Sequence, residues 1–80
     1  MTRQTIAKRL RRIISRWLGA EASVLTFDCP IFKDTCESDL HEITVDIYSQ
    51  FEVCMTVYDF EDLTTFKDLV DYIENEMQEP

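Results

Sequence analysis

The sequence has few of the residues from which metal, disulfide or phosphate-binding sites are built. It contains one histidine, one glycine and three cysteines, and no two of the cysteines form a Cys-x-x-Cys pair. An odd number of cysteines at these spacings excludes a disulfide framework, and a single histidine excludes a typical zinc site. With no glycine-rich phosphate loop and no catalytic constellation, we predict a protein that is not an enzyme and binds no metal. The cysteines are interpreted as reduced thiols of a cytoplasmic protein.

Long apolar runs are also absent. No stretch approaches the roughly 18 apolar residues of a membrane span, so no membrane span is predicted. The arginines near the start interrupt every apolar stretch, which argues against the apolar region of a secretory signal. An arginine-rich start without acids also matches a transit peptide in composition, but we prefer the interpretation in which this segment forms part of the core.

What the sequence does contain is a sharp division of charge. The first twenty residues hold six basic residues and no acid, a charge of +6, whereas residues 21–80 hold sixteen acids and two lysines, a charge of −14. The chain has 80 residues, of which 45% are hydrophobic. This is enough apolar content for collapse, so we predict one folded domain over residues 1–80, with a thin core.

Apolar residues recur every three or four positions in three parts of the chain, which is the pattern of amphipathic helices. The first helix is predicted from Thr5 to Leu18, with Gly19 as its C-cap. The second is predicted to begin at a capping box formed by Asp39 and Glu42. A last helix is predicted to follow a cap at Thr64 or Thr65.

Between these helices the pattern is less regular. Residues 20–38 lose the helical period and contain Pro30, so we expect a long loop that apolar side chains attach to the core. Residues 52–62 alternate like a strand at first, but we interpret them as a turn and a short helix. The expected core consists of the inward positions of the helices, namely Leu10, Ile14, Leu18, Ile43, Ile47, Phe51, Leu63, Val70 and Ile73.

Two segments resemble the acyl carrier protein family. Residues 63–73 read LTTFKDLVDYI and are similar to the last helix of that family, I-T-T-V-x-x-A-I-D-Y-I, with family spacing back to Phe51. Residues 9–19, RLRRIISRWLG, are similar to its first helix, R-V-K-K-I-I-x-x-x-L-G. The resemblance implies an all-α bundle of three to four helices with a long loop between the first two.

The family's function depends on the serine of an Asp-Ser-Leu motif at the start of the second helix, which carries 4′-phosphopantetheine. Here residues 34–40 read DTCESDL, so the serine and the aspartate are exchanged. A count back from Phe51 without a gap puts Glu37 at the serine position, and a count forward from Gly19 puts Asp39 there. A shift of one residue from either count is needed to bring Ser38 to that position.

Three functions remain open at this stage. The leading hypothesis is a divergent carrier-like protein that acts by docking onto partner proteins and lacks the phosphopantetheine arm. The second is a genuine acyl carrier with 4′-phosphopantetheine on Ser38, preceded by the acid Glu37. The third is a small binding module that uses the cationic first helix on anionic partners. Nucleic acid is not expected among these, because the acidic body repels phosphates.

The resemblance also implies the kind of partner. These are acyl-transfer or synthase enzymes of fatty acid or polyketide biosynthesis, whose basic patches dock on acids of the second helix. A monomer is expected. The candidate docking residues are Glu37, Asp39, Glu42 and Asp46.

Overall fold

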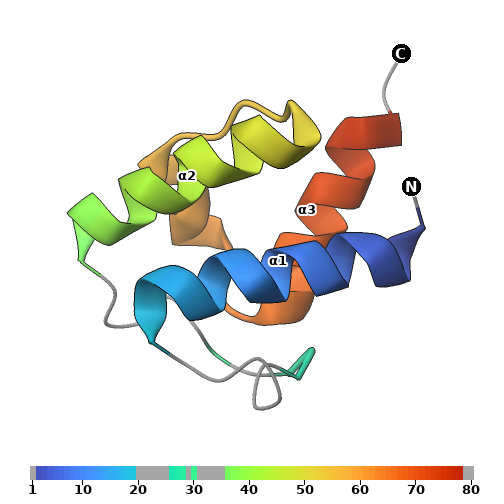
Figure 1. Ribbon diagram of the computed structural model, residues 1–80, viewed down its shortest axis with the longest axis horizontal. Coiled ribbons are helices and arrows are strands. Elements are labelled where there is room, and N and C mark those ends of the chain that lie inside the picture. Colours follow the sequence, from blue (N-terminus) through green and yellow to red (C-terminus); the bar gives the residue numbers. More distant parts are fainter. Residues whose placement is uncertain (1, 20–25, 29, 31–35, 79–80) are drawn as a thin grey trace.

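A computed structural model of the chain describes residues 2–19, 26–28, 30 and 36–78. In these ranges the chain forms α1 (Arg3–Leu18), α2 (Glu37–Phe51), the 3-10 helix η2 (Val57–Asp62) and α3 (Phe66–Gln78). Helices α1 and α2 lie alongside each other and run in opposite directions, and α3 crosses α1 near the end where α1 begins (Figure 1). In the described ranges the predicted all-α bundle is therefore confirmed.

The first helix begins slightly earlier than predicted because Thr2 caps it. The Thr2 side-chain oxygen accepts a hydrogen bond from the backbone N–H of Thr5 at 3.2 Å, which satisfies one of the free donors of the first turn. The predicted end of α1 is confirmed. Gly19 has a left-handed backbone with φ 70°, and its N–H donates to the Ser15 carbonyl at 3.1 Å.

The segment after α2 combines both patterns found in its sequence. Val53 and Met55 are buried, whereas Cys54 and Thr56 between and after them are exposed. This alternation belongs to an extended segment that covers one side of the bundle, and in the part of the chain that the structure describes it joins no sheet. The predicted short helix then follows as η2, which packs against α2.

The last helix starts at the predicted threonine cap. The Thr65 side-chain oxygen accepts from the Asp68 N–H at 3.3 Å, and Asp68 Oδ2 accepts from the N–H groups of Thr64 and Thr65, both at 3.1 Å. These hydrogen bonds favour the ionised carboxylate, so they lower the pKa of Asp68 below its ordinary value.

The described part of the long loop contacts the bundle through Phe27. Its ring stacks on that of Phe66 with 6.1 Å between centroids, and its carbonyl accepts a hydrogen bond from the Lys67 N–H at 2.9 Å. Pro30 forms an isolated bridge with Thr65. For these residues the predicted attachment of the loop is confirmed, whereas most of residues 20–38 lie outside the described ranges.

The core holds the residues predicted for it, with one exception. Eight of the nine are no more than 9% exposed, whereas Leu18, in the last turn of α1, is half-buried and packs at the edge of the cluster. The core is also larger than predicted, since the segment after α2 contributes Val53, Met55 and Phe60. Helix α1 contributes one continuous apolar side, and its basic side chains are left on the outside. The buried residues of α1 are Ile6, Ala7, Leu10, Ile13 and Ile14.

Candidate functional site

The start of α2 is the position at which the family carries its serine, and the structure changes the predicted boundary there. The helix begins at Glu37, with Cys36 in the N-cap position, and not at a capping box of Asp39 and Glu42. The Cys36 side chain makes no capping hydrogen bond, but its carbonyl accepts from the Leu40 N–H at 3.1 Å. The earlier start places Glu37 and Asp39 in the first turn, where the positive end of the helix dipole stabilises acids.

Ser38 therefore occupies the second position of the helix and is exposed. Its hydroxyl oxygen lies 3.2 Å from the sulfur of Cys36, a free and exposed thiol. Successive residues of an α-helix point about 100° apart around its axis. The first position, which matches the gap-free count from Phe51, belongs to Glu37. A side chain at Ser38 thus leaves the helix in a different direction from one at Glu37.

The four candidate docking acids occupy two different environments. Glu37, Asp39 and Glu42 lie in the first two turns of α2, with Glu37 and Glu42 exposed and Asp39 half-buried. Asp46 lies farther along the helix, and its side chain is only 20% exposed. Its carboxylate accepts a hydrogen bond from Trp17 Nε1 at 2.5 Å and lies 3.6 Å from Arg16 Nη1. Asp46 therefore joins α2 to α1, a contact that the spacing of residues in the sequence does not reveal.

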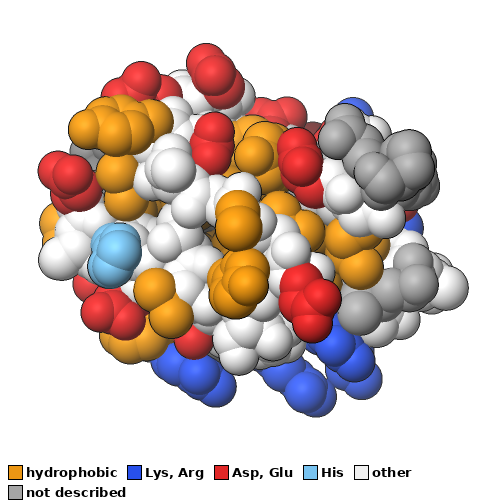
Figure 2. Space-filling view, turned by 90° about the horizontal axis from the view of Figure 1, so that it is seen from above, with side chains coloured by type: hydrophobic (Ala, Val, Ile, Leu, Met, Phe, Trp, Pro, Cys, Tyr) orange, Lys and Arg blue, Asp and Glu red, His pale blue; other side chains and the backbone are white. Residues whose placement is uncertain are grey.

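The outward side of α2 is less polar than its sequence suggests. Thr44, a polar residue, is buried, and its hydroxyl donates to the His41 carbonyl at 2.6 Å. Val45 and Tyr48, by contrast, are 50% and 55% exposed. Together with Cys54 and Met55 these residues line a surface hollow of about 250 Å³. Figure 2 shows hydrophobic side chains gathered in the middle of this face, with acidic side chains around them and basic ones along one edge.

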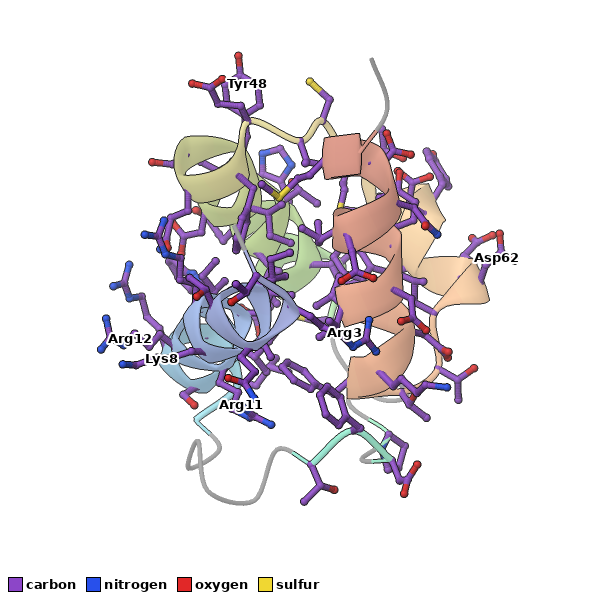
Figure 3. The ribbon with its side chains drawn as sticks, turned by 90° about the vertical axis from the view of Figure 1, so that its right-hand side faces the viewer. Arg3, Lys8, Arg11, Arg12, Tyr48 and Asp62 are labelled. Atoms are coloured by element: carbon purple, nitrogen blue, oxygen red, sulfur yellow. The ribbon has the colours of Figure 1, made fainter. Side chains whose placement is uncertain are left out.

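Part of the basic charge of α1 is paired within the bundle. Arg3 lies 2.6 Å from Asp71 and 3.4 Å from Glu74, and the hydrogen bond to Asp71 raises the pKa of Arg3 above its ordinary value. The Arg11 guanidinium lies over the rings of Phe27 and Phe66, at 5.7 Å and 5.2 Å from their centroids. Figure 3 shows Arg3 beside α3, whereas Lys8 and Arg12 point away from the bundle.

Within the described ranges, no group of histidine, cysteine and acidic side chains could hold a metal ion. None of the helices found there is both long enough and apolar enough to cross a membrane. The chemistry of the site therefore rests on the side chains at the start of α2 and on charge and apolar contact around that helix.

Two known proteins place this arrangement in a family. No family model matches the chain. The acyl carrier protein of Thermotoga maritima is 31% identical over 78 residues, which cover 95% of this chain and 96% of that protein. The acyl carrier protein of Exiguobacterium sibiricum is 32% identical over 80 residues, covering 96% of this chain and all of that protein. Since the similarity spans nearly the full length of each protein and the helical bundle agrees with it, the chain belongs to the acyl carrier protein family.

Proposed function

We propose that this chain is a divergent acyl carrier-like protein of the cytoplasm that acts by docking onto partner enzymes and is not modified with 4′-phosphopantetheine. The observation that carries the proposal is the start of α2. Glu37 takes the first helical position, to which the gap-free count from Phe51 assigns the family's serine, and a carboxylate cannot accept the arm as a phosphodiester in the way that a serine hydroxyl does. The neighbouring hydroxyl of Ser38 is one residue out of register.

Docking is supported by the charge of the first two turns of α2. An acidic patch lies on the first two turns of α2 and consists of Glu37, Asp39 and Glu42. Its negative charge can attract a basic surface of a partner. The apolar hollow beside it offers contact area that charge alone does not supply. Acyl-transfer and synthase enzymes with basic docking patches are the partners that fit this surface. Asp46 contributes less to docking, because Trp17 and Arg16 already bind its carboxylate.

A second candidate function, a holo carrier modified on Ser38, is favoured by two observations. The Ser38 side chain is exposed, and an acid, Glu37, directly precedes it. In this alternative the transferase accepts a serine in the second helical position, and the thiol of the arm carries the acyl group. The two candidates differ in one covalent bond, so a mass measurement separates them.

The experiment incubates the protein with coenzyme A, magnesium and a broad-specificity phosphopantetheinyl transferase, followed by intact-mass measurement. We expect the mass of the wild-type chain to stay unchanged. The matched variant Cys36→Asp/Glu37→Ser/Ser38→Leu, which rebuilds Asp-Ser-Leu at the start of α2, should gain a pantetheine-sized adduct. An adduct on the wild-type chain that disappears in Ser38→Ala and persists in Cys36→Ala would establish the holo carrier instead.

A further inference from the structure

We propose that three exposed basic side chains of α1, Lys8, Arg9 and Arg12, form a cationic ridge that binds the surface of an anionic phospholipid bilayer. The three residues are exposed and lie on the side of α1 away from its buried residues. Figure 3 shows Lys8 and Arg12 pointing together into solvent from that helix. The apolar side of α1 is buried in the core, so the surface of the ridge is charged and not apolar.

In the described ranges the ridge differs from Arg3 and Arg16, which have acidic partners. Arg3 pairs with Asp71 and Glu74, and Arg16 lies near Asp46. Within the ranges that the structure describes, no carboxylate pairs with Lys8, Arg9 or Arg12, and α1 itself contains no acid. Within these ranges, no ion pair therefore neutralises the positive charge of the ridge.

The acids of the far side weaken this charge little at physiological salt. Figure 3 shows Asp62 pointing out of the bundle on the side opposite Lys8 and Arg12. The molecule measures 34 × 25 × 21 Å, whereas charge interactions through solvent decay over about 8 Å at physiological ionic strength. A bilayer in contact with the ridge therefore interacts mainly with the positive charge of the ridge, despite the net charge of −8.

A lipid surface fits the ridge better than other anionic partners do. Single-stranded nucleic acids are bound on exposed aromatic side chains, and protein partners bind tightly through buried aromatic or apolar anchors. The large exposed apolar residues of the described chain all lie outside α1, so the ridge has neither feature. Attraction to anionic lipid needs only basic residues near the surface, each of which increases binding by about fivefold. Three such residues increase it by roughly a hundredfold.

The proposal is tested by cosedimentation with vesicles at physiological ionic strength, about 0.15 M salt, where the acids of the far side are screened. One set of vesicles is pure phosphatidylcholine, and the other is an equal mixture of phosphatidylcholine and phosphatidylglycerol. We expect the protein to sediment with the mixed vesicles only, and to be released at about 1 M salt, where the Debye length falls to roughly 3 Å. Equal binding to both sets, or binding to neither, would overturn the proposal.

Two variants with the same net charge separate the ridge from overall charge. Lys8→Gln/Arg9→Gln/Arg12→Gln and Ser49→Glu/Gln50→Glu/Asn75→Asp each lower the net charge from −8 to −11, and the second set lies on exposed positions of α2 and α3. We expect the first variant to lose binding by roughly a hundredfold and the second to retain most of it. Equal losses would show that overall charge, and not the ridge, governs binding. Helical circular dichroism spectra verify that both variants fold.

A duplex DNA probe at the same salt completes the test. Because three phosphate contacts from the ridge give only weak, salt-sensitive binding and α1 carries no large exposed apolar side chain for stacking, we expect weaker binding to DNA than to the mixed vesicles. Tighter binding to DNA would assign the ridge to nucleic acid instead. This result does not depend on Ser38, so a failure here leaves the proposed docking function unaffected.

Discussion

Replacement of Ile47 with alanine tests the packing on which the whole bundle depends. Ile47 lies in the middle of α2 with no measurable exposure and belongs to the central cluster. Truncation of a buried isoleucine removes its transfer free energy and leaves a cavity, which together cost about 2–5 kcal/mol. A domain of this size has a total stability of roughly 4–12 kcal/mol, so Ile47→Ala removes a large part of it.

The measurement is urea unfolding followed by circular dichroism, with thermal unfolding in parallel. A loss of about 2 kcal/mol corresponds to a fall of roughly 8–16 °C in the midpoint of a domain this small. An unchanged slope of the unfolding free energy against urea concentration would show that the variant exposes the same surface on unfolding as the wild-type chain. The graded variant Ile47→Val should lose about 0.5–1.5 kcal/mol.

The matched control is Val45→Ala on the same helix. Val45 is 50% exposed, so its truncation should change the free energy of unfolding by less than about 0.5 kcal/mol. A loss below about 0.5 kcal/mol for Ile47→Ala, or equal losses for both variants, would refute the assignment of Ile47 to the core.

Three further substitutions test single contacts. Glu52 ends α2 with a left-handed backbone, φ 58°, which glycine adopts without strain. Glu52→Gly should therefore raise the free energy of unfolding by up to about 1 kcal/mol in urea titrations. A lower free energy of unfolding would contradict this account of the helix end. Thr65→Ala removes the cap of α3 and should cost about 1 kcal/mol by the same measurement, whereas an unchanged midpoint would show that the cap contributes nothing. Because the pKa of Asp68 is lower in the folded state, the contribution of Asp68 to the free energy of unfolding should be complete above its ordinary pKa of about 3.9. This contribution should disappear as the pH falls through the lowered value. Asp68→Asn should therefore flatten the acid limb of the stability profile, and an unchanged limb would refute the assignment.

The helices were largely predictable because their buried sides repeat with the helical period. In α1 the period is uninterrupted and the glycine that ends the helix is the only one in the chain, so the sequence predicts the end of α1 correctly. The segment after α2 was harder. Its alternation of Val53 and Met55 with exposed neighbours is real, but it serves an extended cover over the bundle and not a sheet. Alternation reports which side chains are buried and does not report whether the strand has a partner.

The predicted start of α2 is wrong because a capping pattern determines the first residue of a helix only weakly. A capping side chain contributes only about 1 kcal/mol, whereas each buried side chain of the helix contributes more. The buried residues Ile43, Ile47 and Phe51 determine the register of the helix but leave its first residue open. Beginning at Glu37 adds the hydrogen bond from Leu40 to Cys36 and brings two acids to the helix dipole, which offsets the missing cap.

Asp46 shows why a candidate site cannot be derived from spacing alone. On a helical projection Asp46 belongs with the outward acids. Its neighbours along the sequence do not indicate the contact with Trp17, which is twenty-nine residues away. An indole N–H at the edge of a core needs an acceptor, and Asp46 supplies it while also attracting Arg16. A partner enzyme that engaged Asp46 would have to compete with this contact between α1 and α2. The docking proposed for this chain therefore relies on the acids before it, Glu37, Asp39 and Glu42, in the first two turns of α2.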